Sequence, residues 1–331
     1  MKPGLFRLLL ATAVVISHVS NLEIGRPAVM IFFILSGYWV ARMYDKKYAA
    51  APNTLRIFYL SRALRIWPLY AACLILTVTV FSLSNINIHD IHASSFMLLG
   101  IASTGHDPLG VSWSLDIEMQ FYLLLPLLLG LFSWADQHAS GQMKLQGILF
   151  AAFLWGWYLQ LEFGIWTVLS YLPAFAAGIF LARSKYLPSI HTAMRSAIAF
   201  VAIGLIAAFI PLTQVFLLKD AATPFPEDWF GMLWASTLIP FIAFSVQQKS
   251  AQLDRHLGNI SYALYLIHWP VLLLTQSFLA APLGNGWKTA ALLFSAITSL
   301  LVYRLLDIPL EKLRHRLVEH QQQSHGKKVP A

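Results

Sequence analysis

Long hydrophobic runs, each close to the thickness of a lipid bilayer, recur from one end of the chain to the other. A helix that crosses the hydrocarbon core needs about 20 predominantly apolar residues, and only helices or closed barrels satisfy their backbone polar groups there. We therefore predict an all-α fold, a polytopic transmembrane helix bundle of about ten spans in a lipid bilayer. The spans are roughly 5–22, 27–44, 62–83, 118–135, 146–161, 165–183, 195–217, 229–247, 258–281 and 287–308.

The positive charges indicate how these spans are oriented. With a cytoplasmic N-terminus, all but three of the 23 Lys and Arg residues fall on the inner side, the exceptions being Arg26, Lys219 and Lys288. Positive residues concentrate in cytoplasmic loops, so both termini are predicted to be cytoplasmic. Because the cations lie in alternate loops, the net charge of +8 does not indicate a nucleic-acid partner. Oligomeric state cannot be deduced.

No long polar linker divides the chain, so we predict one membrane domain over residues 1–310 and a polar, basic cytoplasmic tail over 311–331 that frays into solvent. Only 11% of residues are charged, against about 25% in soluble proteins. The single cysteine, Cys73, excludes an internal disulfide framework. A signal peptide at the N-terminus is the rival interpretation, but no convincing cleavage site follows and the next span begins almost at once.

The first span carries Arg7 and His18, with ten residues between them. Eleven steps of about 100° amount to roughly three turns, so both side chains should share one helix face about 16 Å apart. This spacing places an imidazole about halfway across the membrane. An ionisable group at that depth is a candidate functional residue, although a histidine packed between helices would also fit.

Two further stretches have both a structural and a functional interpretation. Ser36 and Gly37 in the second span are typical of close helix packing, but they could also act directly. Arg62 and Arg65 are three residues apart, so they should share a face at the inner end of the third span. A guanidinium pair suits phosphate groups, and it equally suits topological anchoring.

The outer side contributes acidic residues and histidines. The loop from 84 to 112 contains His89, Asp90, His92, His106 and Asp107, but their spacing matches no established ligand pattern, so a solvated loop without metal is favoured. After this loop, Glu118 and Tyr122 should share a face of the fourth span, where a carboxylate needs a partner; His18 is at a compatible depth.

A second intramembrane imidazole, His268, lies in the ninth span just before Pro270. Proline can kink a helix and free a backbone carbonyl beside it. We favour a structural or supporting role for His268 over a direct catalytic one.

Taken together, these stretches resemble the acyltransferase-3 family, bacterial integral-membrane O-acyltransferases that modify cell-envelope glycans and some antibiotics. Five segments carry the resemblance: Arg7-x10-His18, Phe32-Phe33-Ile34-Leu35-Ser36-Gly37, Arg62-x-x-Arg65, Trp113-Ser114-Leu115-x-x-Glu118-x-x-Phe121-Tyr122 and Ile260-Ser261-Tyr262-x-x-Tyr265-Leu266-x-His268-Trp269-Pro270. The segment Gly25 to Met30 departs from the usual Gly-Val-Asp, so the role of that acidic position is in doubt here.

The resemblance implies a ten-span enzyme of the bacterial cytoplasmic (inner) membrane, an acyltransferase for groups other than aminoacyl groups. It implies acyl-CoA, with acetyl-CoA as the default, as the cytoplasmic donor, and a hydroxyl of a glycan or lipid-linked sugar as acceptor. His18 would be the catalytic histidine with Arg7 as its motif partner, and Arg62 and Arg65 would meet the coenzyme. Because the chain ends soon after its last span, the stand-alone type without an SGNH domain is expected.

From these expectations follows a mechanistic hypothesis. His18 acts as general base on the acceptor hydroxyl, Glu118 orients the imidazole, and Arg7 helps Arg62 and Arg65 to hold the coenzyme. An acyl-histidine intermediate stays open, as do the oxyanion donors. The residues expected to contact substrate or support the site are Ser36, Trp113, Ser114, Tyr122, Ser261, Tyr262, Tyr265 and His268.

Two other classes of function compete with this hypothesis. A glycolipid or small-solute transporter or flippase could use buried His, Arg and Glu residues as a proton relay. It should show paired broken helices in two related halves, and the sequence shows no such pairing. A non-catalytic scaffold or envelope sensor would not need the buried ionisable residues.

Overall fold

The structure, a computed structural model, describes residues 1–49, 53–87, 91–219 and 227–326. These residues form helices joined by short connections, and the β-structure among them is one isolated bridge between Leu22 and Leu218. The predicted all-α fold is confirmed. The chain divides into two compact units: the first comprises Met1–Leu35 and Ser184–Tyr303, and the second comprises Ser36–Arg183 and the residues from Arg304 onward.

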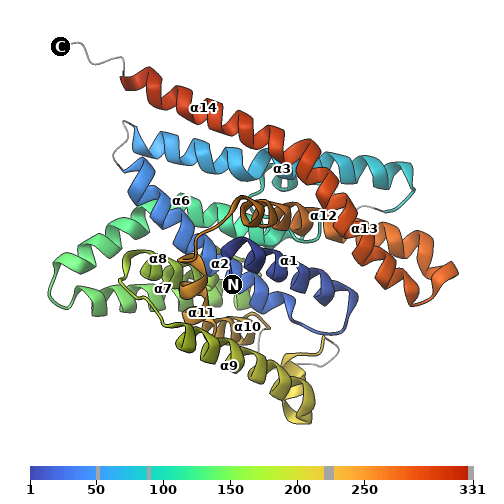
Figure 1. Ribbon diagram of the computed structural model, residues 1–331, viewed down its shortest axis with the longest axis horizontal. Coiled ribbons are helices and arrows are strands. Elements are labelled where there is room, and N and C mark those ends of the chain that lie inside the picture. Colours follow the sequence, from blue (N-terminus) through green and yellow to red (C-terminus); the bar gives the residue numbers. More distant parts are fainter. Residues whose placement is uncertain (50–52, 88–90, 220–226, 327–331) are drawn as a thin grey trace. The chain divides into compact units, whose positions relative to one another are not determined.

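The first unit is built on α1 (Pro3–Val19) and α12 (Gln252–Leu283), drawn in dark blue and brown-orange in Figure 1. They run parallel, because Gly4 contacts Asp254 at one end and His18 contacts His268 at the other. Ala11, Val15 and Leu264 form the apolar core between the two helices.

The remaining helices of the first unit cover this pair or form a second core. α13 (Gly286–Val302) follows α12 and packs on it. α9 (Ile190–Phe209), η3 (Pro211–Phe216), α10 (Glu227–Ser236) and α11 (Ile239–Val246) make up the rest, together with the first part of α2 (Gly25–Met43). Their core contains Ala207, Leu217 and Trp234, with the Trp234 ring stacked on Phe200 at 4.9 Å between ring centroids.

The second unit contains the rest of α2, the π-helix η1 (Tyr44–Tyr48) and the long helices α3 (Thr54–Leu83), α6 (Ser112–Gln137) and α7 (Gly141–Phe163). Short helices α4 (Ala93–Met97) and α5 (Ile101–Thr104) precede α6, and η2 (Val168–Tyr171) and α8 (Leu172–Arg183) follow α7. The Phe121 and Phe175 rings stack at 4.1 Å. A Cβ on Gly37 would lie 2.2 Å from the Phe175 carbonyl oxygen, so the predicted close packing at Gly37 is confirmed.

Helices occupy all the predicted spans, but several boundaries were wrong. Residues 229–247 form α10 and α11, bent by 60°, because Pro240 cannot donate a backbone hydrogen bond and starts a new helix. The α-helix in the predicted span 195–217 is α9, and it already ends at Phe209. Within the described ranges, six helices are long and apolar enough to cross a membrane, or seven if the bent pair forms one span. The count of about ten and the cytoplasmic termini stay predictions.

The C-terminal segment differs from its prediction. The tail was expected to fray, but α14 (Ile308–Gly326) is a continuous helix that follows the π-helix η4 (Tyr303–Asp307). α14 packs along α3, and both are visible in Figure 1, α14 in red and α3 in light blue. Polar contacts from Glu311 and Arg314, described below, hold this charged helix against α3.

Candidate active site

The N-terminus of α1 is capped by a carboxylate from α12. Lys2, at the N-cap position, makes no side-chain hydrogen bond, which would leave the first backbone N–H groups of α1 without partners. The Asp254 side chain accepts hydrogen bonds from the N–H of Gly4 at 3.1 Å and of Leu5 at 2.9 Å. A negative charge there also complements the helix dipole. Asp254 was missed from the sequence because it lies 250 residues away.

Glycines let α1 and α12 approach closely beside Arg7. A Cβ on Gly4 would lie 1.7 Å from the Asp254 carbonyl oxygen. A Cβ on Gly258 would lie 3.2 Å from the Gly4 Cα and 3.4 Å from Nη1 of Arg7. The Arg7 side chain therefore lies against the backbone of α12 at Gly258, and the two helices contact each other almost backbone to backbone.

His18 lies on the same face of α1 as Arg7, which confirms the predicted shared face. Its ring centroid is 5.2 Å from that of His268 and 4.8 Å from that of Trp269. His18 lies in the last turn of α1, which ends at Val19, and its expected position about halfway across the membrane stays a prediction. His18 is level with the middle of α12, because His268 is 16 residues, or about 24 Å, from the start of that helix.

The contacts of His268 define its tautomer. Its Nδ1 lies 2.9 Å from the carbonyl oxygen of Tyr265 and 3.1 Å from that of Leu264. Carbonyl oxygens only accept hydrogen bonds, so we assign the proton to Nδ1. Nε2 then carries a lone pair, and it is buried without a hydrogen-bond partner among the described residues. His268 therefore has a buried ring nitrogen with an unpaired lone pair, and its ring contacts that of His18.

Two of the three predicted outer cations gather around the C-terminal end of α1. The Lys219 ammonium donates to the carbonyl oxygen of Ser17, the residue before His18. The backbone N–H of Glu23 donates to the carbonyl oxygen of Leu217 at 2.7 Å, which holds the segment before Lys219 close to the end of α1. Arg26, in the first turn of α2, pairs with Asp228 at 3.2 Å. A cation at a helix C-terminus is favoured by the helix dipole, so Lys219 fixes the end of α1 that bears His18.

The predicted pair Glu118 and Tyr122 is bonded in the second unit. The Tyr122 hydroxyl donates to Oε1 of Glu118 at 2.7 Å, and the Ser36 hydroxyl donates to the same oxygen at 2.5 Å. The shared face of Glu118 and Tyr122 is thus confirmed, and Ser36 joins them. His18 belongs to the first unit, so its orientation by Glu118 stays a prediction.

Other motif residues bond to the backbone nearby or pack against aromatic rings. Ser114 donates to the Val111 carbonyl at 3.1 Å, and Ser261 donates to the Gly258 carbonyl at 2.7 Å. The Trp113 ring packs near Tyr171 at 5.9 Å, and Tyr265 packs edge-on to Phe32 at 6.2 Å. These contacts are structural. The predicted substrate contacts of these residues and of Tyr262, which is half-buried on α12, stay predictions.

Arg62 and Arg65 lie within α3, which begins at Thr54, and their position at the inner end of the span stays a prediction. The side chain of Arg65 reaches α14 and its neighbour: Nη1 is 3.3 Å from Oδ1 of Asp307 and 3.4 Å from Oε2 of Glu311. Arg62 is only 6% exposed. Its guanidinium lies 5.8 Å above the Tyr122 ring, and Nη2 is 3.5 Å from Sδ of Met43.

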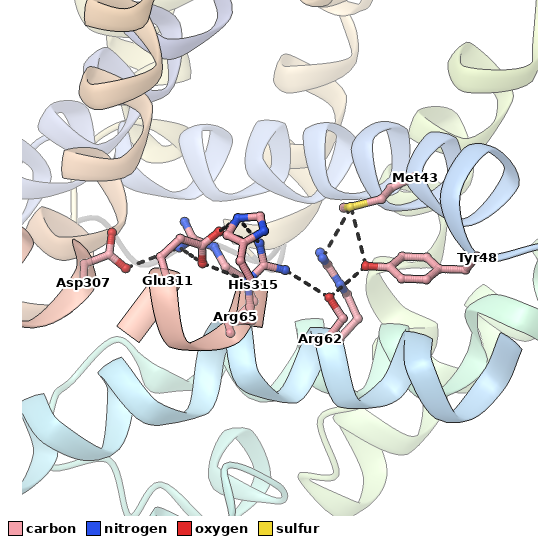
Figure 2. Close-up of polar contacts among 9 residues, drawn as sticks. Met43, Tyr48, Arg62, Arg65, Asp307, Glu311 and His315 are labelled. Atoms are coloured by element: carbon pink, nitrogen blue, oxygen red, sulfur yellow. Dashed lines mark hydrogen bonds and ion pairs between the residues drawn. The ribbon is translucent and has the colours of Figure 1, made fainter. Parts of the chain in front are cut away.

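Figure 2 shows how α14 joins this arginine pair. Arg314 donates through Nη1 to the Ser61 hydroxyl at 3.0 Å and through Nε to Oε2 of Glu311 at 2.8 Å. Ser61 also accepts from the Tyr48 hydroxyl at 2.8 Å. Arg314 and Glu311 were missed because the tail was expected to be solvated. The i,i+3 spacing of Glu311 and Arg314 was the available signal.

A metal centre finds no support in the described parts of the chain. No three His, Cys, Asp or Glu side chains gather there as metal ligands. The rings of His92 and His106 in the predicted outer loop lie 3.7 Å apart between centroids, tilted by 32°. His89 and Asp90 lie outside the described residues.

Comparisons with known proteins identify the family of the chain. A family model described as "Acyltransferase domain", of the Acyl_transf_3 family, matches residues 3–304. The chain is 26% identical to Nodulation protein 10 of Rhizobium leguminosarum bv. viciae, over 91% of this chain and 86% of that protein. No solved structure matches the chain significantly. The match over nearly the whole length shows that the chain belongs to the acyltransferase-3 family and is a membrane acyltransferase.

Proposed function

We propose that this acyltransferase moves an acyl group, acetyl by default, from cytoplasmic acyl-CoA to a hydroxyl of a cell-envelope glycan or lipid-linked sugar. The placement of His18 against His268 is the observation that carries the proposal. It puts an imidazole of the family's motif beside a buried nitrogen lone pair, on two helices held together from end to end. The proposed location is a bacterial inner membrane, with about ten spans and both termini cytoplasmic. The Rhizobium relative supports a bacterial setting.

His18 is the proposed general base. It takes the proton of the acceptor hydroxyl while that oxygen attacks the thioester carbonyl, forming the new C–O bond. The C–S bond then breaks, and the thiolate of CoA leaves with the proton returned by the imidazolium. A base must be neutral to act, and the Lys219 ammonium at the Ser17 carbonyl favours this state, because it disfavours a second positive charge nearby.

His268 is the proposed positioning residue for His18. Its Nε2 lone pair can accept the N–H of the His18 ring, which directs the second ring nitrogen of His18 toward the acceptor hydroxyl. This contact performs the orienting task that a carboxylate performs in a catalytic triad. Glu118 remains a second candidate for orienting the imidazole, and it also holds Ser36 and Tyr122 in place.

The donor's phosphates are assigned to Arg62 and Arg65, with Arg7 as a further cation. Guanidinium groups bind phosphate oxygens through paired hydrogen bonds, so a cluster of arginines on the predicted cytoplasmic side suits CoA. Arg62 supports this assignment, because its Nε is buried and has no hydrogen-bond partner within the described ranges. A buried unsatisfied donor is costly, and a bound anion would satisfy it.

The test is acyl-CoA turnover by the purified protein in nanodiscs, comparing wild type with His18→Ala. CoA thiol release is followed with candidate glycan acceptors. His18→Ala should lower kcat by at least about a hundredfold, the lower range for loss of a general base, with CoA binding kept. His191→Ala, an exposed histidine on α9, is the matched control and should behave as wild type. Near-normal turnover by a folded His18→Ala protein would refute the proposal.

A further inference from the structure

One carboxylate on α14 is surrounded by cations. Glu311 Oε2 lies 2.8 Å from Nε of Arg314 and 3.4 Å from Nη1 of Arg65. Its Oε1 accepts from Nη2 of Arg314 and lies 3.2 Å from Nε2 of His315. Figure 2 shows these groups converging on Glu311 from both α3 and α14. The carboxylate therefore occupies the place that an anion would take between the two guanidinium groups.

The cluster still carries more positive than negative charge. It contains three guanidinium groups, Arg62, Arg65 and Arg314, but two carboxylates, Asp307 and Glu311. Both carboxylates lie within reach of Arg65. Arg62, 6% exposed, contacts the sulfur atom of Met43 and the aromatic face of Tyr122, and its buried Nε is unpaired in the part of the chain that the structure describes. The network thus provides charge and a donor for one more anion.

We propose that Glu311 is an internal competitor for the donor's phosphates, so that α14 acts as a latch on the arginine cluster. In the free protein the Glu311 carboxylate occupies Arg65 and Arg314. A phosphate of acyl-CoA displaces it and binds Arg314 in addition to Arg62 and Arg65. This inference rests on the proposed function for the identity of the donor. The recognised chemistry is a phosphate group, which a nucleotide or an anionic lipid could supply.

Electrostatics favour this exchange. A phosphate carries up to two negative charges and three acceptor oxygens, against one charge and two oxygens for the carboxylate, so it gains more from the same guanidinium groups. Glu311 and Arg65 are partly exposed, with 25% and 19% of their side-chain surfaces accessible. Solvent screens such pairs, so the free-energy cost of separating the Glu311 carboxylate from its partners is small. An internal anion of this kind lowers donor affinity while preserving the arginines' arrangement.

The experiment measures CoA affinity by calorimetry for the full-length protein in phosphatidylcholine nanodiscs. Glu311→Gln keeps the size and one acceptor oxygen but removes the charge, so CoA should bind about two- to fivefold more tightly, the range for a lost competing ion pair. Arg314→Gln should weaken CoA binding by a similar factor. Asp136→Asn, an exposed carboxylate on α6, is the matched control and should bind as wild type.

Unchanged or weaker CoA binding by Glu311→Gln, with an unfolding midpoint equal to that of the wild type, would overturn the latch. If His18-dependent turnover is intact in that case, the proposed function stands without it. Conversely, if the wild type does not bind CoA but Glu311→Gln gains affinity for inorganic pyrophosphate, the latch stands and the donor assignment fails. A gain seen only in nanodiscs with phosphatidylglycerol identifies the lipid headgroup as the source of the phosphate.

A second measurement covers the case in which Glu311→Gln does not fold. Hydrogen exchange is followed in the wild type with and without CoA. Displacement of Glu311 loosens the contact between α14 and α3, so CoA should speed exchange around residues 308–318. Equal or slower exchange in this segment when CoA is bound would refute the proposal.

Discussion

A single methyl group added at Gly4 should disturb both the stability of the first unit and its chemistry. The Cβ of Gly4→Ala would lie 1.7 Å from the Asp254 carbonyl oxygen and 2.6 Å from its carbon, whereas ordinary contact begins at 3.4 Å. Backbone atoms cannot rotate away as a side chain can. The N-terminal part of α1 must therefore move from α12 by about 1.7 Å, the difference between the two distances.

The energetic cost has two parts. Overpacking of a close contact costs about 1–3 kcal/mol. The movement also stretches the hydrogen bonds from Gly4 and Leu5 to Asp254, each worth about 1 kcal/mol. The total of about 3–5 kcal/mol lowers the ratio of folded to unfolded protein by at least about a hundredfold, at ~1.4 kcal/mol per factor of ten. If the shift extends to His18, a 1 Å misplacement lowers turnover by about a hundredfold.

The assay is reversible unfolding by denaturing detergent, followed by turnover of the folded fraction. Gly130→Ala is the matched control, because it adds the same methyl group to a helix position with no atom within 4 Å of the new Cβ. It should be neutral or stabilise by up to about 1 kcal/mol. Gly4→Ala and Gly130→Ala with the same stability and turnover would refute the close contact between α1 and α12.

Two further variants test the second unit. Glu118→Gln should lower kcat at least about tenfold with little effect on the KM for acyl-CoA, because the charged acceptor for Ser36 and Tyr122 is lost; equal kcat in steady-state kinetics would exclude a role in chemistry. Asp107 accepts hydrogen bonds from the N–H of Ser112 and Trp113 at the start of α6, and burial raises its pKa above 3.8. The folded state then binds a proton more strongly than the unfolded state, so stability falls as pH rises from 3.8 to the raised pKa. Asp107→Asn should remove that slope in unfolding midpoints measured across this range; an unchanged slope would contradict the assignment.

Features set by helical periodicity could be predicted from the sequence. Arg7 and His18 face α12 together, and Tyr122 bonds Glu118, because residues spaced by whole turns share a face whatever the partner. The break between α10 and α11 also had a local signal in Pro240. Such features depend on nearby residues alone.

Features that depend on distant segments could not be predicted. Asp254 caps α1 across 250 residues, and Lys219 reaches Ser17 across 202 residues. The tail looked solvated because its charges are numerous, yet Glu311 finds Arg65 and so α14 folds onto α3. Composition predicts only that a highly charged segment faces solvent. It does not predict an ion pair with a residue 246 positions away, and this pair holds the segment against α3.

The pairing of α1 with α12 has a consequence for how the chain is assembled during synthesis. α1 emerges first from the ribosome, but Asp254 and His268 follow more than two hundred residues later. Until then the short first helix has no carboxylate for its first turn and His18 has no neighbouring imidazole. The first unit is therefore completed only after the residues from Ser36 to Arg183 have been synthesised. A chain interrupted before α12 would hold a complete arginine pair on α3 but no assembled histidine pair.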